Sequence, residues 1–374
     1  MKFICDKTTL SEAVNNVSPA VSAKSSMAAL ECVLLRCTGS VLSVIGYNLE
    51  LGITKDLAVS SGESGAVILN ARLFGEIINR MPNTEISVST DDKLLTIIKG
   101  GGAQFTILGM GAEEYPEIPV VTEEKSFRIG ADTLRSMISQ TLYAVSQDAS
   151  TPVLTGVLFE KKAGTLSLVS VDGCRLALRR EAIEGGEDFR FIVPGKTLSE
   201  LLKLLSRFSG GEAEVLVKAG SKHIVFDCGG YQVISRLLEG EFIDYNTAIP
   251  KEHKTRVILS AREFAESIGR ASIIINEKIK NPVKAVFEEN RVSISCETPM
   301  GKVSDQMSAE IEGSPVRVGF NNKFMTDALK ASEEDELGLE INTAFSPNKL
   351  LPKEGDSFTF LVMPMRLKDD NETH

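Results

Sequence analysis

The chain has 374 residues and carries 41 lysines and arginines against 51 aspartates and glutamates, a formal net charge of −10. Hydrophobic residues make up 43% of it and charged residues 25%, a composition that excludes a disordered chain. No apolar run reaches the ~18 residues of a membrane span, and residues 1–6 lack the apolar segment of a signal peptide, so we expect a cytoplasmic protein.

Residues up to 108 have the pattern of one α+β unit. In chain order, the predicted elements are a helix around Leu10, Val14 and Val17, strands at 32–37 and 41–45, a strand ending at Leu69, a helix at 72–81, strands at 85–89 and 94–99, a glycine turn at 100–102 and a strand at 104–108. Pro82 and Asn83 stop the second helix. Segments 113–124 and 242–254 are predicted to be linkers.

The sequence repeats this unit three times. Residues 41–45 align with 165–169 and 291–295, and residues 68–78 align with 192–202 and 318–328, at the same offsets of 124 and 126. Phe74, Leu198 and Phe324 occupy one position of the second anchor. The apolar residues of the first helix recur as Leu134, Ile138 and Leu142 and as Phe264, Ile268 and Ala271. Short amphipathic segments often look alike, but two anchors at equal offsets favour a triplicated domain of roughly 120 residues.

Cations recur at helical spacing on the predicted helices. They are Arg72 and Arg80, then Lys196, Lys203 and Arg207, then Lys323 and Lys330, with Arg262 and Arg270 on the first helix of the third unit. Steps of four, seven and eight return to nearly one helix face, so each helix should place an apolar face on its sheet and a basic stripe outward. One such stripe is most simply a solvated face. Three copies favour a basic strip that binds a polyanion through its phosphates, although the net charge alone argues against nucleic acid.

Motifs for catalysis or metal binding are missing from the sequence. The three histidines have no ligand spacing, and the glycines at 100–102 lack the Lys-Ser/Thr of a phosphate-binding loop. Asp172, Cys174 and Arg175 are adjacent, but no histidine is near to stabilise a thiolate. We therefore expect no catalytic residue, metal or cofactor. We also expect six reduced, buried cysteines and a solvated acidic loop at 333–336.

Five segments resemble the bacterial sliding clamp family, the β subunit of DNA polymerase III. They are 1–3, 153–159, 171–177, 275–278 and 362–367, and the likeness extends from Met1 to Leu367. The most specific are D-G-C-R-L-A, beginning at Asp172, and V-M-P-M-R-L, beginning at Val362.

The resemblance implies an α+β fold of three clamp domains in an arc, each with two helices packed on two antiparallel sheets. The domains would be 1–120, 128–246 and 255–367, followed by a polar, disordered tail at 368–374 that could hang near the peptide pocket. Two chains would close head to tail into a ring around duplex DNA, with the basic helices and Lys24 inside. Such a homodimer is a non-catalytic processivity factor that an ATP-driven clamp loader places on DNA.

The resemblance also implies a hydrophobic pocket for short peptide motifs from the polymerase III α subunit, the clamp loader, other DNA polymerases and repair proteins. Carried over position by position, its residues are Leu154, Gly173, Cys174, Arg175, Leu176, Ile243, Thr247, Ala248, Ser346, Leu361, Val362, Met363, Pro364, Met365 and Arg366. Cys174, Thr247 and Ile243 stand where the family often has His, Arg and Pro, which leaves the motif preference open.

The dimer seam is expected between strand 104–108 and the third domain of the partner. Phe105 and Ile107 match the family's interface positions on one side, and Ile273 and Ile274 match those on the other.

Two alternatives stay open from the sequence. A protein that grips one side of the duplex would not depend on DNA being circular, whereas a ring slides off linear DNA. An enzyme using Asp172, Arg175 and Cys174 would lose its function in Cys174→Ala, which in a clamp changes peptide affinity only modestly.

Overall fold

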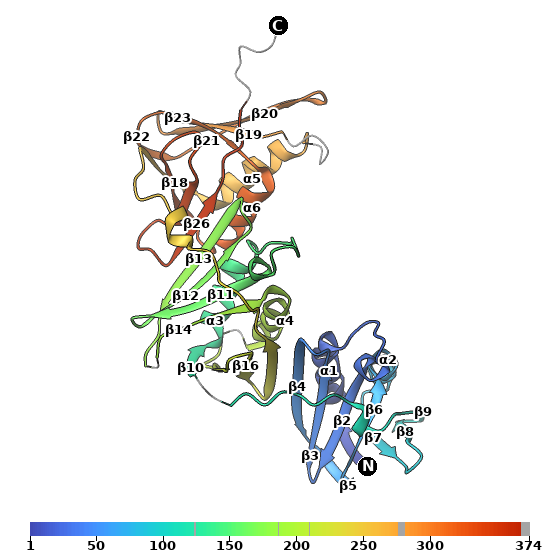
Figure 1. The fold of residues 1–374 in the computed structure, drawn as a ribbon. Helices are drawn as coiled ribbons and strands as arrows, with labels where there is room; N and C mark the ends of the chain where they lie inside the picture. Colours follow the sequence, from blue (N-terminus) through green and yellow to red (C-terminus); the bar gives the residue numbers. More distant parts are fainter. Residues whose placement is uncertain (123–124, 186, 209, 276–280, 368–374) are drawn as a thin grey trace. The chain divides into compact units, whose positions relative to one another are not determined.

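The computed structural model describes residues 1–122, 125–185, 187–208, 210–275 and 281–367 (Figure 1). The tail predicted at 368–374 and most of segment 275–278 lie outside these residues. The chain divides into two compact units, one made of residues 1–134 and 196–237 and the other of residues 135–195 and 238 onward.

The first repeat contains the predicted first helix and the hairpin that follows it, and the structure adds strands at Lys2–Asp6, Leu51–Ala58 and Ser60–Glu63 that the sequence analysis did not predict. Its elements are β1 (Lys2–Asp6), α1 (Lys7–Val17), η1 (Ser18–Ala20), η2 (Ala28–Glu31), β2 (Cys32–Thr38), β3 (Val41–Tyr47), β4 (Leu51–Ala58), β5 (Ser60–Glu63), β6 (Gly65–Asn70), α2 (Ala71–Arg80), β7 (Glu85–Thr90), β8 (Leu95–Gly100), β9 (Ala103–Leu108) and η3 (Ala112–Glu114).

The second and third repeats have the same order of helices and main strands as the first, but no strand equivalent to β5 or β22 is described in the second. The second contains β10 (Lys125–Gly130), α3 (Ala131–Leu142), η4 (Pro152–Thr155), β11 (Gly156–Lys162), β12 (Thr165–Val171), β13 (Arg175–Ala182), β14 (Phe189–Pro194), α4 (Gly195–Leu205), η5 (Ser206–Phe208), β15 (Glu214–Ala219), β16 (His223–Cys228), β17 (Tyr231–Arg236) and η6 (Tyr245–Ala248). The third contains β18 (Thr255–Ser260), α5 (Ala261–Ser272), β19 (Val283–Glu288), β20 (Arg291–Thr298), β21 (Gly301–Ser308), β22 (Glu310–Gly313), β23 (Val316–Phe320), α6 (Asn322–Ala331), β24 (Glu336–Ile341), β25 (Asn348–Pro352) and β26 (Phe358–Val362).

Both sequence anchors of the repeat are confirmed. Segments 41–45, 165–169 and 291–295 lie in β3, β12 and β20, each the second strand of an antiparallel hairpin. Segments 68–78, 192–202 and 318–328 each run from a strand into the second helix of the repeat. The predicted turn at 100–102 separates β8 from β9.

Polar residues at the strand-to-helix corners explain where four of the helices begin. The side chains of Asp6, Asn70, Ser260 and Asn321 each accept a hydrogen bond from a backbone N–H in the first turn of α1, α2, α5 and α6. Such a cap satisfies an N–H that has no partner inside the helix. The repeat therefore fixes the start of these helices, and with it the positions of their surface charges.

The predicted apolar helix faces form the core. Leu10, Val14 and Val17 are fully buried on α1, and Phe264, Ile268 and Ala271 are fully buried on α5. On α3, Leu134 and Ile138 are fully buried, whereas Leu142 is only partly buried. Burial of this repeated apolar stripe against the sheets supplies the hydrophobic stabilisation of each repeat.

The predicted antiparallel sheets are present, and some of them continue from one repeat into the next. Among the described residues, the strands form antiparallel sheets in the orders β5-β1-β7-β8-β9, β10-β15-β16-β17-β4-β3-β2-β6, β14-β11-β12-β13-β26-β25-β24-β18-β22 and β21-β20-β19-β23. The second of these joins strands of the first and second repeats, and the third joins strands of the second and third. Pairing satisfies backbone groups that separate sheets would leave unpaired at their edges.

The two joins between repeats use equivalent strands. In one, the last strand of the second repeat, β17, pairs with β4, and Val233 lies opposite Ile53. In the other, the last strand of the third repeat, β26, pairs with β13, and Phe360 lies opposite Ala177. Ile53 and Ala177 are equivalent positions of the repeat, because they are separated by the offset of 124. The same position of the earlier repeat is therefore paired with the last strand of the next repeat in both joins.

No helix in the described part of the chain has the length and apolar character needed to cross a membrane.

Candidate binding sites

The ten cations predicted to face DNA are all exposed in the structure. Nine of them lie where the sequence predicts: Lys24 in the loop after η1, Arg72 and Arg80 on α2, Lys196 and Lys203 on α4, Arg262 and Arg270 on α5, and Lys323 and Lys330 on α6. The prediction that Arg207 lies on the same helix as Lys196 and Lys203 is wrong, because α4 ends at Leu205 and Arg207 lies in the 3₁₀ turn η5.

Five of these cations form ion pairs with carboxylates. The pairs are Arg72 with Glu76 (3.2 Å), Lys203 with Glu200 (2.8 Å), Arg207 with Glu12 (2.8 Å), Arg262 with Glu266 (2.9 Å) and Arg270 with Asp305 (2.6 Å). Within the described residues, no hydrogen bond or ion pair engages the other five, Lys24, Arg80, Lys196, Lys323 and Lys330.

The join between β13 and β26 brings together the two segments that most resemble the clamp family. Arg175 lies opposite Val362 and Leu176 opposite Leu361 in the antiparallel register. The backbone N–H of Met363 also donates to the Cys174 carbonyl at 2.9 Å. Pocket residues from two repeats therefore lie side by side on neighbouring strands.

An apolar cluster underlies these strands. Leu176 and Leu361 are buried in it together with Leu158, Val171, Phe242 and Tyr245, and Leu154 and Ile249 pack against it in part. Leu176, Leu361 and Val362 are buried, whereas Gly173, Cys174 and Met363 are exposed. The residues predicted for the pocket thus include both core members and side chains open to solvent.

Arg175 is held by groups from both repeats rather than left free. Its Nε donates to Asp172 Oδ2 at 2.8 Å, and its Nη1 donates to Asp327 Oδ2 on α6 at 2.7 Å. The guanidinium also lies over the ring of Phe324, 4.7 Å from its centroid. Only 10% of the side chain is exposed, and the two carboxylates raise the pKa of Arg175 against the opposing effect of burial.

Phe324 shows how the third repeat departs from the other two. The equivalent residues Phe74 and Leu198 are fully buried, whereas Phe324 is only partly buried and lies beside Arg175. Its position in the repeat predicts a core residue, and the contact with Arg175 could not be found from the sequence.

Cys174 is the exception among the cysteines. Cys5, Cys32, Cys37, Cys228 and Cys296 are free and buried, as predicted, whereas Cys174 is free and exposed. The Asp172 carboxylate accepts hydrogen bonds from the backbone N–H groups of Cys174 and Arg175 and so shapes this turn. Asp172 is thus engaged by the backbone and by Arg175, an arrangement of a structural turn rather than of a nucleophile and its base.

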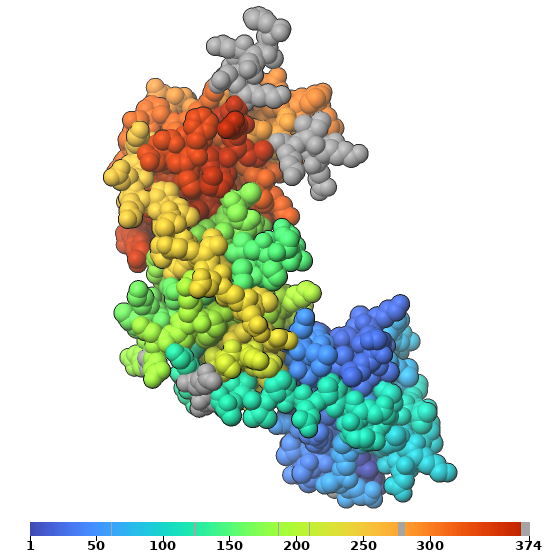
Figure 2. All heavy atoms as spheres, in the orientation of Figure 1, coloured from blue at the N-terminus to red at the C-terminus, as the bar shows by residue number. Residues whose placement is uncertain are grey.

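Segment 242–254, predicted to be a linker, connects β17 to β18 and is anchored by specific contacts. Phe242 and Tyr245 are buried, and the segment crosses the surface of its unit (Figure 2). The Tyr245 hydroxyl donates to Glu160 Oε2 at 2.6 Å, and Arg190 Nη2 donates to the Phe242 carbonyl at 3.2 Å. Burial, followed by the hydrogen bond to Glu160, raises the pKa of Tyr245 to about 12. These contacts fix the predicted pocket residues Ile243, Thr247 and Ala248, all exposed, at the edge of the apolar cluster.

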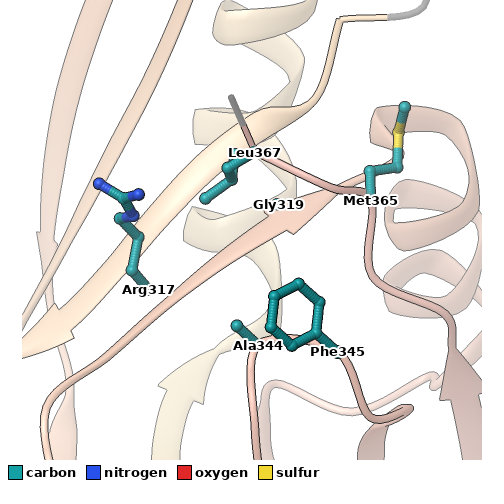
Figure 3. Close-up of a pocket in the computed structure, with 6 residues that line it drawn as sticks. All are labelled: Arg317, Gly319, Ala344, Phe345, Met365 and Leu367. Carbon is teal, nitrogen blue, oxygen red and sulfur yellow. The ribbon is translucent and has the colours of Figure 1, made fainter. Parts of the chain in front are cut away.

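A small cavity of about 80 Å³ lies where the C-terminal segment returns to β23 (Figure 3). The backbone N–H of Met365 donates to the Gly319 carbonyl at 2.8 Å. Phe345, which is 73% exposed, lies beside Ala344 and faces the space between Arg317 and Met365. Ser346 belongs to the adjoining turn, in which its backbone N–H donates to Thr343 Oγ1.

The sequence analysis did not identify Gly319 and Phe345, which line this cavity, or Asp327, which accepts a hydrogen bond from Arg175. A Cβ on Gly319 would lie 2.5 Å from the Met365 carbonyl oxygen, so only glycine lets the C-terminal segment approach. No residue pattern in the sequence distinguishes this glycine from the others.

The residues predicted for a dimer seam are accessible. Phe105 is 40% exposed on β9, an edge strand that pairs only with β8 in the described sheet, and Ile107 is partly buried. Ile273 is 80% exposed at the end of α5, whereas Ile274 packs in part against the core of its own unit. No cluster of metal-ligating residues occurs among the described side chains.

Models of the DNA polymerase III β subunit family match the chain in three consecutive parts. The N-terminal domain matches residues 1–119, the central domain 128–244 and the C-terminal domain 246–366. The beta sliding clamp of Bacillus subtilis is 31% identical and covers 98% of this chain and 100% of its own length. That of Staphylococcus aureus is 30% identical and covers 98% and 99%.

Solved structures give the same result. The crystal structure of the DNA polymerase sliding clamp from Bacillus subtilis has a TM-score of 0.94 at 30% identity and covers 98% of this chain and 100% of that one. A sliding clamp from Pseudomonas aeruginosa bound to griselimycin has a TM-score of 0.93 at 26% identity, with the same coverage.

Proposed function

The chain belongs to the DNA polymerase III β subunit family, and we propose that it acts as a DNA sliding clamp. In this proposal a homodimeric ring encircles duplex DNA and tethers the replicative polymerase and other partners, which confers processivity in replication. The chain supplies no catalytic residue and no cofactor. Its clamp domains are 1–120, 128–246 and 255–367.

The observation that carries the proposal is the strand pairing between repeats. Each join pairs the last strand of the later repeat with the third hairpin strand of the earlier one, β17 with β4 and β26 with β13. In the described sheets, the equivalent strands without such a partner are β9 of the first repeat and β21 of the third. Pairing β9 of one subunit with β21 of another repeats the same join and uses both remaining edges.

The repeat also supplies the register of this join. Phe105 pairs with Ile98 on β8 as Val233 pairs with Phe226 on β16, so Phe105 and Val233 are equivalent. Val303 pairs with Cys296 as Ala177 pairs with Ser170, so Val303 and Ala177 are equivalent. Phe105 should therefore lie opposite Val303 of the partner subunit, near Ile273 and Ile274 of that subunit.

The exposed cations on α2, α4, α5 and α6, together with Lys24, are assigned to the DNA-facing surface. Contacts to phosphates hold the duplex without reading its sequence, as a ring that moves along DNA requires. The residues around the β13–β26 join and segment 242–249 are assigned to the peptide pocket. Apolar walls with an adaptable methionine, Met363, suit short motifs with Leu or Phe anchors.

A topological experiment tests the ring. We would place one cysteine at Phe105 and one at Val303 in a Cys174→Ser background and oxidise the dimer in the presence of a nicked circular plasmid. The cross-linked ring should stay on the circle in concentrated salt and leave it when a restriction enzyme linearises the plasmid. The single-cysteine variants serve as controls.

Two results would contradict the proposal. Equal retention on linear and circular DNA would support a protein that grips one side of the duplex. Failure of the cysteines to cross-link in a chain whose solution mass exceeds the 40.5 kDa of one copy would place the seam elsewhere.

A further inference from the structure

The cations assigned to DNA fall into those bound to a carboxylate and those without one. Arg72 and Arg262 are the most exposed of the paired group, with 89% and 86% of their side chains accessible. Each nevertheless donates through Nε to a glutamate four residues later, at 3.2 Å and 2.9 Å. Such freely accessible side chains have many other conformations, so the pairing decides where their charge is directed.

The same local sequence builds both pairs. A helix-capping residue is followed by Ala, Arg, one variable residue, Phe, another variable residue and Glu, at 70–76 and again at 260–266. The buried Phe74 and Phe264 fix the rotation of each helix, so Arg and Glu share the outward face. The cap fixes the first turn, and the spacing of four residues then brings the two charges together.

A third carboxylate occurs at the equivalent place on α4. Lys196 and Glu200 follow Arg72 and Glu76 at the repeat offset of 124. Here Glu200 accepts from Lys203 with both oxygens, at 2.8 Å and 2.9 Å, and Lys196 is left without a partner in the described structure. The acid therefore recurs on α2, α4 and α5, whereas α6 has Thr326 at the equivalent place.

We propose that Glu76, Glu200 and Glu266 are built-in counterions that weaken the hold of this surface on DNA. A carboxylate offers Arg and Lys the same kind of acceptor oxygens as a phosphate, so it competes for the same donors. A cation already neutralised by a fixed carboxylate releases little counterion on meeting DNA. Arg207 and Arg270 are paired with other acids, Glu12 and Asp305. Full-strength phosphate contacts are then left to the cations without a partner in the described structure, Lys24, Arg80, Lys196, Lys323 and Lys330. This role rests on the proposed function, in which topology rather than affinity retains the ring.

The test compares two variants with equal change in charge. Glu76→Gln/Glu266→Gln removes two of the three proposed counterions. Glu289→Gln/Glu297→Gln removes two exposed carboxylates that pair with Arg291 (3.7 Å) and Lys302 (3.6 Å) of the β19–β20–β21 sheet instead of with cations of the helices. Binding of a fluorescein-labelled duplex is followed by anisotropy between about 50 and 200 mM salt.

The counterion variant should bind on the order of 5-fold more tightly at the lowest salt, with a salt dependence steeper by about 1 to 2 in the log–log slope. The control should match the parent within about 2-fold, because its carboxylates pair with none of the cations assigned to DNA. In a second comparison, Arg80→Gln/Lys330→Gln should weaken binding more than Arg72→Gln/Arg262→Gln.

The outcomes separate the two proposals. If the parent binds duplex in a salt-dependent manner and both glutamate double variants behave alike, the counterion role is wrong and the clamp proposal is untouched. Equal losses of duplex affinity in Arg80→Gln/Lys330→Gln and Arg72→Gln/Arg262→Gln would also overturn the counterion role. A parent chain with no salt-dependent binding to duplex would reject the DNA-facing surface itself, and the counterion role with it.

Discussion

The guanidinium of Arg175 and the carboxylate of Asp327 lie 2.7 Å apart and connect the start of β13 to helix α6. Arg175 belongs to the segment that resembles the clamp family most closely, whereas Asp327 is 152 residues away in the sequence. The pair therefore ties the pocket segment of the second repeat to the third repeat. The Arg175 guanidinium also lies over the ring of Phe324, which is only partly buried.

Asp327→Asn tests this tie. The change keeps the shape of the side chain but removes the charge, and leaves the largely buried Arg175 with one carboxylate, Asp172. Since about a third of Asp327 is exposed, we expect a loss of only about 1–2 kcal/mol in the free energy of unfolding. Urea denaturation measures it. In an Arg175→Met background the same substitution should cost nearly nothing, and an equal cost in both backgrounds would show that the pair is not coupled.

Gly319→Ala should displace the C-terminal segment. The added Cβ would meet the Met365 carbonyl oxygen at 2.5 Å and a Leu367 side-chain carbon at 2.9 Å. We expect about 1–3 kcal/mol of destabilisation and weaker binding of a fluorescent polymerase-derived peptide in polarisation measurements. Gly269→Ala is the matched control, because nothing lies within 4 Å of that Cβ and the helix gains propensity. Unchanged peptide affinity in Gly319→Ala would remove segment 363–367 from the pocket.

Tyr245→Phe tests whether segment 242–249 is held by its hydrogen bond to Glu160. Loss of this 2.6 Å bond should cost about 1 kcal/mol and loosen the segment that carries Ile243 and Thr247. Hydrogen exchange of residues 242–249 should accelerate. Tyr47→Phe is the control, since its hydroxyl makes only a 3.4 Å contact with the Leu49 carbonyl. Identical exchange in the two variants would argue against the role of Glu160.

Alkaline pH should destabilise the fold in a defined range. Burial raises the pKa of the Cys5 and Cys32 thiols from 9.0 to about 11, and that of Tyr245 from 10.0 to about 12. Because the neutral forms are favoured in the folded state, their contribution is complete below the unfolded pKa and is lost as pH rises through the folded one. The free energy of unfolding should therefore fall from about pH 9 to 12.

Urea unfolding at a series of pH values checks this dependence. Cys5→Ala should reduce the slope between about pH 9 and 11, where only the unfolded thiol is ionised. A stability that stays level to pH 11 would be inconsistent with the burial of these groups.

Ile273→Ala tests the proposed seam. Ile273 is 80% exposed in the single chain, so its truncation should change the unfolding of a monomer little. In the dimer it should cost about 2–5 kcal/mol if the side chain is buried there, and Ile273→Ala/Ile274→Ala should give monomers in sedimentation. Leu73→Ala, which truncates an exposed leucine on α2, should leave the dimer intact. A dimer that survives the double substitution would contradict this seam.

Periodicity in the sequence predicted the repeated elements because local spacing decides which face of a helix or strand is apolar. Leu10, Val14, Val17, Phe264, Ile268 and Ala271 are all buried as expected, and the three strand-to-helix anchors lie where the offsets place them. Periodicity failed for Arg207, which lies beyond the end of α4, and the expectation that cysteines are buried failed for Cys174, which lies in a turn. Capping and loop geometry, rather than periodicity, determine where a helix ends and whether a residue in a turn is exposed.

Most of the order of secondary structure and the outward direction of the cations were thus contained in the sequence alone, since each depends on residues within about one helical turn or strand of one another. The triplication was visible because the same local patterns recur at equal offsets, whereas strands such as β1 and β4 were found only in the structure. Tertiary structure decided which strands of neighbouring repeats pair, which cations are bound to carboxylates and how Arg175 and Tyr245 fix the pocket. Those features join residues far apart along the chain, and no local pattern specifies which distant partner a hydrogen-bonding group will meet.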